Sequence, residues 1–216
     1  MSQRRSRKNI KGFNGIRGIG TLAALFYHLF PNTFKGGFLA VNLFFVLSGY
    51  LLYYTAETDV RTFYRKRIRR IYPALFLIVF ITMGLFQFLD ASVIDSKVWE
   101  ILSIFGGYNN FYQIQEKASY FTRMETSSPF TNMWCIAIEM QFYLLWPWLY
   151  KLYQKCHRNN LLWIVPMAVS MFLCIVLYQP DRVTNVYYST LTRMFALFAG
   201  VWLCCLPVKP IPEKTV

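Results

Sequence analysis

Long runs of apolar residues alternate with short polar stretches along the whole chain. Six runs approach the roughly 20 residues that an α-helix needs to cross a bilayer. They are residues 15–30, 37–54, 71–89, 133–150, 161–179 and 186–206. The first run is short and is extended by its flanks. The pattern predicts an all-α, polytopic transmembrane helical bundle with about six spans and no internal repeat.

The connection between the third and fourth runs, residues 91–131, is long. Its best apolar piece, residues 98–114, contains Glu100 and the pair Gly106–Gly107, and we interpret it as a re-entrant or interfacial segment. Connections longer than about 15 residues are often functional. This loop is therefore a candidate for contact with an acceptor outside the cell.

Composition and charge agree with a membrane protein. The 216 residues are 56% hydrophobic and 19% aromatic, with a mean hydropathy of +0.32. The net charge of +13 does not imply nucleic acid, because Lys and Arg gather at residues 4–11, 61–70 and 151–158, all on one side of a six-span topology. The positive-inside rule places that side, and both termini, in the cytoplasm.

The same signals divide the chain into three parts. We expect a cytoplasmic basic segment at residues 1–11, a transmembrane domain at 12–206 and a cytoplasmic tail at 207–216. No small-residue cleavage site follows the first apolar run, so we expect that run to stay in the cell membrane. The five cysteines form no Cys-x-x-Cys pair, and we expect neither a disulfide framework nor a metal site.

Arg17 and His28 are the ionisable groups of the first apolar run. They lie eleven residues apart, which is three helical turns plus about 20°, so they share one helix face and differ in depth by about 16 Å. Ionisable side chains in a membrane usually face a protein interior or a watery cavity. The pair is therefore a candidate site. The alternatives are a snorkelling anchor for Arg17 and a backbone hydrogen bond for His28.

Two further groups are candidates for the same site. Arg67 and Arg70 lie one turn apart at the expected entrance of the third helix, where they could clamp a ligand that carries phosphate. Glu139 lies about two turns inside the fourth helix. There it could meet His28 and fix the tautomer of the imidazole.

Three other positions are expected to be structural or solvated. Pro73 suits the first turn of the third helix, because its missing N–H would be unpaired there anyway. Arg193, in the sixth run, is expected to bond to a carbonyl or to Glu139. His157 lies in a basic connection and is expected to be solvated.

Several short motifs follow one another in order along the chain. They are Arg17-x10-His28, Gly36-Gly37-Phe38, Phe44-Phe45-x-x-Ser48-Gly49, Arg67-x-x-Arg70 before Pro73, and Trp134-x4-Glu139-x-Gln141-Phe142-Tyr143 leading to Trp146-Pro147. Their order and spacing resemble the acyltransferase family 3 membrane proteins. That family includes bacterial O-acetyltransferases of peptidoglycan and other exported glycans. The resemblance covers about residues 15–200.

The resemblance implies that an acyl group, usually acetyl, moves from cytoplasmic acetyl-coenzyme A to a hydroxyl of an extracytoplasmic carbohydrate. It makes His28, supported by Glu139, the base or acyl relay, and a hydroxyl needs a base that titrates near neutrality. The residues implied to bind the acyl donor are Arg17, Arg67, Arg70 and Ser48. The lipid bilayer, the donor and the carbohydrate are the expected partners.

The chain departs from the family pattern in three ways. Asn42 stands where the family usually has an aspartate, and Cys135 stands where it usually has a serine after the tryptophan. Family members have about ten spans, so six spans predict an incomplete acyltransferase domain. Two alternatives follow from the residues: a proton-coupled transporter of a small anion, and a truncated membrane partner without catalysis.

Overall fold

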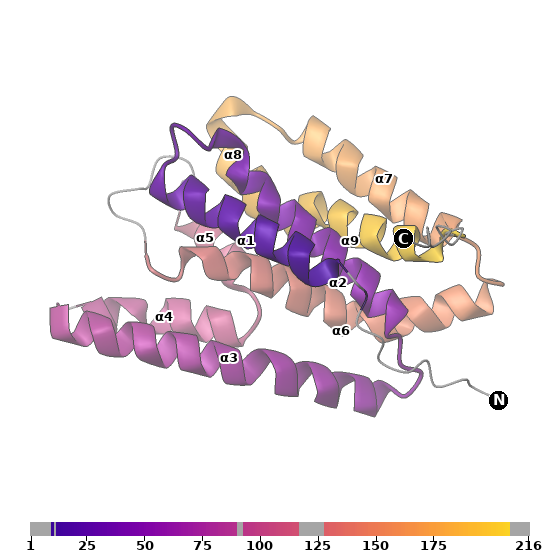
Figure 1. The fold of residues 1–216 in the computed structure, drawn as a ribbon, viewed down its shortest axis with the longest axis horizontal. Coiled ribbons are helices and arrows are strands. Elements are labelled where there is room, and N and C mark those ends of the chain that lie inside the picture. The colour runs from indigo at the N-terminus through magenta and orange to yellow at the C-terminus, as the bar shows by residue number, and fades with distance from the viewer. Residues whose placement is uncertain (1–9, 11, 90–92, 117–127, 208–216) are drawn as a thin grey trace, which may run out of the picture.

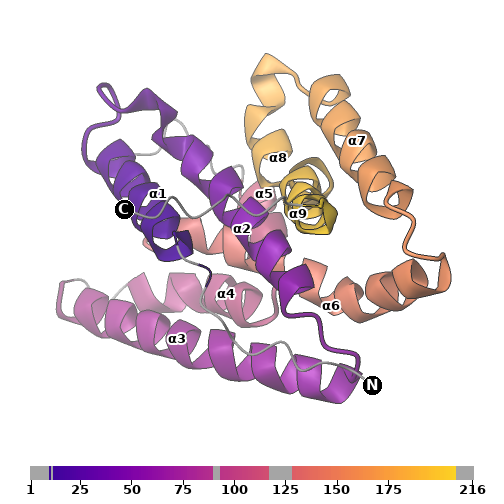
Figure 2. The same cartoon turned by 45° about the vertical axis from the view of Figure 1, so that its right-hand side comes forward.

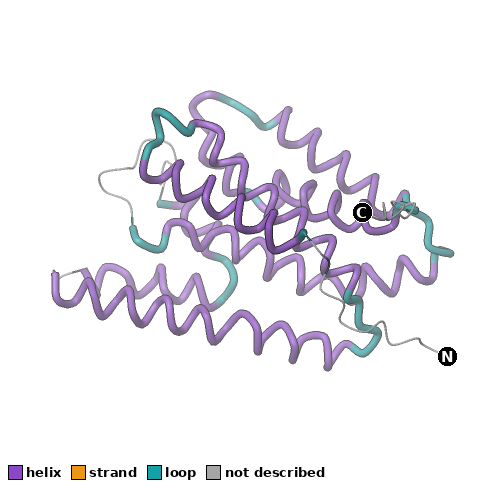
Figure 3. Tube along the Cα trace, in the orientation of Figure 1, coloured by secondary structure: helices purple, strands orange, loops and turns teal. Residues whose placement is uncertain are grey.

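The computed structural model describes residues 10, 12–89, 93–116 and 128–207. Within these ranges every regular element is a helix (Figure 3). They are α1 (Phe13–Leu29), η1 (Lys35–Leu39), α2 (Ala40–Tyr54), α3 (Val60–Leu89), α4 (Val93–Phe105), α5 (Asn109–Gln115), η2 (Thr131–Met133), α6 (Trp134–Lys155), α7 (Leu161–Val176), η3 (Pro180–Arg182), α8 (Val183–Tyr188) and α9 (Thr190–Cys205). Most of the predicted terminal segments, and residues 117–127 of the predicted acceptor loop, lie outside the described residues.

The long helices lie side by side and run back and forth between two ends of the molecule (Figure 1). The turn end, on the left in Figure 1, is formed by residues 30–36, 128–133 and 177–182. The basic end, on the right, is formed by residues 55–70 and 150–160. α3 and α4 make an antiparallel pair on one side of the molecule (Figure 2), and α4 also contacts α6.

The predicted all-α membrane fold is confirmed. Each of the six apolar runs folds as helix. Within the described part of the chain, three helical segments are long and apolar enough to cross a membrane: Lys35–Tyr54, Val60–Phe86 and Val183–Cys205. α7 is a shorter apolar helix, and α1 has 17 residues. The last run is not one straight helix, because Ser189 takes an extended conformation between α8 and α9.

The third helix begins eleven residues before its predicted start, so the prediction for Pro73 is wrong: this proline lies inside α3. Asp59 caps the true start, because its Oδ2 accepts the Thr62 backbone N–H at 2.8 Å. Hydrogen bonds from the Thr62 side chain and backbone hold the pKa of the Asp59 carboxyl below its usual value. The basic run that follows consists of good helix formers. Arg67 and Arg70 are therefore interior residues of a long helix.

α2 and α9 touch through their backbones at two glycines. A Cβ at Gly49 would overlap the carbonyl of Leu197, and a Cβ at Gly200 would overlap the carbonyl of Val46. Small residues at such crossings let helices approach closely in a membrane. Large side chains that are almost fully buried pack beside this contact: Phe45, Trp134, Phe142, Trp146, Trp163 and Leu197.

The segment predicted to be re-entrant or interfacial folds as two short helices. Gly107, with φ of +71°, ends α4 and turns the chain into α5. The Tyr108 N–H donates to the Ser103 carbonyl at 2.9 Å across this turn. α4 has 13 residues and α5 has seven, so neither reaches the length of a membrane span. α5 packs against α6 and α8.

Candidate functional site

Glu139 is the centre of a polar cluster between α2 and α6. Its Oε1 accepts a hydrogen bond from Ser48 Oγ at 2.6 Å, and its Oε2 accepts one from Tyr143 OH at 3.1 Å. Glu139 and Tyr143 are one turn apart on α6, so they share a face. We call Ser48, Glu139 and Tyr143 the inner cluster.

Arg67 of α3 packs against the inner cluster. Its guanidinium carbon lies 4.9 Å from the centre of the Tyr143 ring and 5.4 Å from that of Phe63, within the range of a cation–π interaction. Arg67 is half-buried, whereas Arg70, one turn further along, is exposed. Both cations attract Glu139 electrostatically. The structure therefore brings the two arginines to the inner cluster, as a pair with one fixed and one exposed member.

Helix register places Arg17 at the same level. α1 and α2 are antiparallel (Figure 1), and a Cβ at Gly20 would lie 3.1 Å from the Phe44 ring. Because the helices are antiparallel, three residues back from Gly20 along α1 reach the level of three residues forward from Phe44 along α2. Arg17 thus lies level with residues 47–48, on a half-buried face. The four predicted donor-binding residues therefore lie around the level of the inner cluster: Ser48 belongs to it, Arg67 packs on it, Arg70 is one turn from Arg67, and Arg17 is level with Ser48.

His28 lies at the turn end, away from the inner cluster. Its Nε2 is 3.4 Å from Asn132 Nδ2, which precedes α6. Glu139 follows Asn132 by seven residues, which corresponds to about 10 Å of helical rise. The pairing of His28 with Glu139 that the sequence suggests is therefore replaced: Ser48 and Tyr143 engage the carboxylate, and Asn132 faces the imidazole. The depth of each residue along its own helix sets these partners.

Arg193 makes the structural bond that the sequence predicts. Its Nε donates to the Tyr187 carbonyl at 2.9 Å, and its Nη1 donates to Asn42 Oδ1 at 3.2 Å. The guanidinium also stacks on the Tyr187 ring, 4.2 Å from its centre. α8 ends at Tyr188, and carbonyls of a last helical turn favour a cation. Asn42, where the family usually has an aspartate, serves as the side-chain acceptor.

Gln141 belongs to a different polar network, although it is only two residues from Glu139. Two residues correspond to about 200° of rotation, so these side chains leave α6 on opposite faces. Gln141 Nε2 donates to the Gly107 carbonyl and to Asn110 Oδ1, both at 2.8 Å, and its Oε1 accepts from Thr190 Oγ1 at 2.6 Å. Gln141 therefore ties α5 and α9 to α6 and is structural.

Three polar side chains near these groups were not assigned a role from the sequence. Tyr143 could have been found, because it follows Glu139 by one turn. Asn132 and Glu100 offer no such signal, since both lie where no long apolar helix predicts a face. Asn132 contacts His28, and Glu100 is a carboxylate buried in α4.

Comparisons with known proteins give one consistent result. The family model described as an acyltransferase domain, that of acyltransferase 3, matches residues 10–214. YrhL of Bacillus subtilis is 35% identical over an alignment of 219 positions that covers 95% of this chain. The peptidoglycan O-acetyltransferase OatA of Listeria monocytogenes is 31% identical over an alignment of 233 positions that covers 99% of this chain. The O-acetyltransferase OatA of Staphylococcus aureus is 31% identical over an alignment of 229 positions that covers 98% of this chain.

The matched regions are only part of these relatives. They cover 34% of YrhL and 38% of each OatA protein, so the chain spans just over a third of the length of the curated relatives it matches. No solved structure matches the chain significantly.

Proposed function

Because this chain belongs to the acyltransferase 3 family, we propose that it moves an acyl group, acetyl in the first instance, from a coenzyme A thioester to a hydroxyl of a carbohydrate across a bacterial cell membrane. One observation carries the proposal. Arg67 packs on the inner cluster and Arg70 lies one turn from it on α3, whereas the exposed His28 lies beside Asn132 at the turn end, about 10 Å of helical rise from Glu139. Donor and acceptor would thus enter from opposite ends.

The charge of the two ends supports an orientation for the transfer. Described cations at the basic end are Arg61, Arg65, Lys66, Arg67, Arg69, Arg70, Lys151, Lys155 and Arg158, whereas the turn end has Lys35 and Arg182. Lys97 of α4 lies near the turn end, because it pairs with the Glu100 carboxylate that binds Ser128. The positive-inside rule favours a cytoplasmic basic end. Coenzyme A thioesters are made in the cytoplasm, so the donor would meet Arg67 and Arg70 first.

The proposed donor site uses the arginines in different ways. Arg70 is exposed and would capture the phosphates of the donor, for which the guanidinium fork is well suited. Arg67 is held between two aromatic rings and would fix the position of the bound phosphate. Glu139 would keep Ser48, Tyr143 and Arg67 in register rather than act on the imidazole. Arg17 would face the donor from α1 at the same level.

The proposed chemistry takes place at His28. The acceptor hydroxyl gives its proton to the imidazole Nε2 as its oxygen attacks the acyl carbonyl. The new C–O bond forms, the C–S bond breaks, and the proton passes from the imidazole to the leaving thiolate. General-base catalysis of this kind contributes typically 10²–10⁴-fold. Since His28 is exposed at the turn end, a bulky carbohydrate can reach it.

The names of the relatives support the acceptor class. OatA of Listeria monocytogenes is a peptidoglycan O-acetyltransferase, and we propose a carbohydrate of an exported glycan as the acceptor for this chain.

Proteoliposomes test the proposal. Labelled acetyl-coenzyme A is enclosed or added outside, an acetylatable glycan fragment is supplied on either side, and release of coenzyme A is measured together with labelled glycan. We expect transfer only when donor and acceptor are on opposite sides. In a background with native cysteines changed to serine, Arg61→Cys and Lys35→Cys identify the two faces by their reaction with an impermeant maleimide. Proton-coupled anion uptake without acyl transfer, or neither activity, would contradict the proposal.

A further inference from the structure

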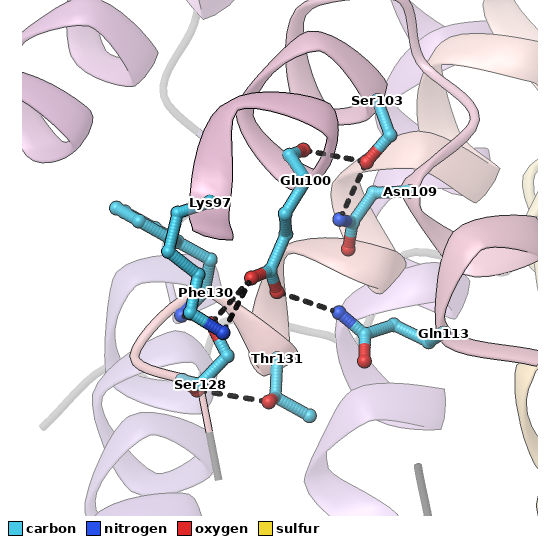
Figure 4. Close-up of polar contacts among 8 residues, drawn as sticks. All are labelled: Lys97, Glu100, Ser103, Asn109, Gln113, Ser128, Phe130 and Thr131. Atoms are coloured by element: carbon cyan, nitrogen blue, oxygen red, sulfur yellow. Dashed lines mark hydrogen bonds and ion pairs between the residues drawn. The ribbon is translucent and has the colours of Figure 1, made fainter. Parts of the chain in front are cut away.

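A buried carboxylate anchors the connection that leads into α6. Glu100 is 1% exposed, and both of its oxygens are used (Figure 4). Oε1 accepts from Gln113 Nε2 at 2.9 Å, and Oε2 accepts from Ser128 Oγ at 2.6 Å. Lys97 Nζ lies 3.4 Å from Oε2 and completes an ion pair. Burial of a carboxylate is costly unless it is paired and hydrogen-bonded, and here it is both.

Ser128 connects the Glu100 carboxylate to the turn that precedes α6. Its Oγ accepts the Phe130 N–H at 3.2 Å, and its carbonyl accepts the Thr131 hydroxyl and N–H at 2.8 and 3.1 Å. Phe130 is fully buried. These bonds close the chain into a tight turn immediately before Asn132. The position of residues 128–132 therefore depends on the carboxylate beneath Ser128.

Asn132 ends this turn and faces the catalytic imidazole. Its carbonyl accepts the Cys135 thiol at 3.1 Å, and its Nδ2 lies 3.4 Å from His28 Nε2. An amide nitrogen can donate hydrogen bonds but cannot accept them. The imidazole Nε2 must then be the acceptor, which leaves the ring proton on Nδ1. This is the tautomer that a base working through Nε2 requires.

We infer that Asn132 is a positioning residue that keeps His28 in the tautomer with an unprotonated Nε2, and that Glu100 holds Asn132 in place through Ser128. The inference rests on the proposed function for its kinetic part. The amide occupies the Nε2 lone pair that an acceptor hydroxyl would need. A contact of 3.4 Å is longer than a usual hydrogen bond, so an arriving hydroxyl can displace the Asn132 amide easily. The lone pair of Nε2 is then available to accept the proton of the hydroxyl.

Nitrogen-15 NMR of histidine-labelled protein in lipid nanodiscs reads the tautomer without any need for activity. The chain has two histidines, so His157→Asn leaves His28 as the only labelled ring. Asparagine suits that position, because His157 has φ of +53° and asparagine tolerates this region. At alkaline pH we expect an unprotonated Nε2 and a protonated Nδ1. A wild-type ring that carries its proton mainly on Nε2 overturns the inference.

Two substitutions of Asn132 separate a tautomer effect from packing. Asn132→Asp has nearly the same shape, but its carboxylate accepts where the amide donates. We expect the proton of His28 to move to Nε2, or a second proton to be taken up, and kcat to fall by about 10²-fold or more with the donor KM unchanged. Asn132→Ala removes the contact without reversing it, so mixed tautomers and a loss of about tenfold are expected. Equal spectra and rates for the two variants contradict the inference.

Substitutions of Glu100 test the anchor. Glu100→Gln keeps one acceptor, and Gln113 can turn its amide to match, so near wild-type spectra are expected. Glu100→Ala leaves the Ser128 hydroxyl and the Gln113 amide without their acceptor and should reproduce the spectrum of Asn132→Ala. If Glu100→Ala does not fold, Ser128→Ala cuts the same route and keeps the carboxylate paired with Lys97.

Ser103→Ala is the matched control. Ser103 lies in the same cluster, where its Oγ donates to the Glu100 carbonyl at 2.6 Å and accepts from Asn109 Nδ2 at 2.9 Å, but it is off the route to Asn132. We expect unchanged His28 signals. A change as large as that of Glu100→Ala means that the cluster acts through general packing and overturns the role of Glu100. An inactive protein with the expected tautomers counts against the proposed function alone.

Discussion

At the inner cluster, Glu139 accepts hydrogen bonds on both oxygens, and a half-buried arginine packs on the neighbouring ring. At the turn end, His28 and Asn132 are exposed and meet at 3.4 Å. The inner cluster is built by α2, α3 and α6, whereas His28 belongs to α1 and Asn132 to the turn before α6. Asn132 and Glu139 are about 10 Å apart in helical rise. One is a closed network of three helices, and the other is an open pair.

Because one site is closed and the other is open, substitutions in the two sites should affect stability and activity differently. Groups that join helices inside a bundle cannot change without loss of packing, because each leaves a buried partner unpaired. Groups at an open end can be removed with little effect on the fold. We therefore expect substitutions at the turn end to lower activity alone, and substitutions at the inner cluster to lower stability and activity together.

His28→Ala gives the sharpest test of the open end. Loss of a general base typically costs 10²–10⁴-fold in rate, and an exposed side chain contributes little to packing. We expect acyl transfer to fall by that factor while thermal unfolding in detergent stays near wild type. His157→Asn, in the solvated basic connection, is the control and should keep full activity. Wild-type rates for His28→Ala would remove this residue from the mechanism.

Glu139→Ala should destabilise the inner cluster. Ser48 and Tyr143 lose their acceptor, and Arg67 loses a nearby negative charge. Hydrogen bonds to charged groups contribute about 1.5–3 kcal/mol each, so we expect the free energy of unfolding to fall by about 3 kcal/mol. Glu139→Gln retains one acceptor oxygen and should lose roughly half of that amount. Chemical denaturation in detergent measures both. Unchanged stability of Glu139→Ala would mean that the cluster is not structural.

Gly49→Ala tests the backbone contact that positions the inner cluster. Gly49 follows Ser48, and its Cβ would overlap the Leu197 carbonyl. Overpacking of this kind costs typically about 1–3 kcal/mol, and the displaced Ser48 should also weaken donor binding. Gly84→Ala is the control, because a Cβ there meets no atom within 4 Å. We expect the control to keep or slightly raise stability, and equal effects of the two substitutions would contradict the close approach.

The helices could be predicted from the sequence because a membrane span needs a long apolar run, and such runs are visible in a single chain. The start of α3 was missed for the same reason. Residues 60–70 are basic, so hydropathy ends the span at residue 71, although a capping Asp59 and good helix formers extend the helix. Hydropathy detects the membrane part of a helix and not its full length.

Within the candidate site, only the relative positions of residues on the same helix could be predicted from the sequence. Arg17 and His28 fall on one face because both belong to α1, and Arg67 and Arg70 form a pair because both belong to α3. The partner of Glu139 was not predictable, because contacts between helices depend on their relative depth. Asn132 escaped notice because a turn, rather than a helical period, places it.

Asn42→Asp tests a polar contact that lies between the inner cluster and the turn end. We expect the smallest effect from this substitution. Asn42 lies six residues from Ser48, about 9 Å along α2, and its Oδ1 accepts from Arg193 Nη1 at 3.2 Å. An aspartate turns this bond, which is already charge-assisted by the guanidinium, into an ion pair, but its own desolvation offsets part of the gain. We expect stability to rise by up to about 1 kcal/mol. Asn42→Leu, which removes the acceptor, should instead lower it. If the aspartate lowers stability as much as the leucine does, this site is too dry for a carboxylate, and Arg193 is better served by the neutral amide.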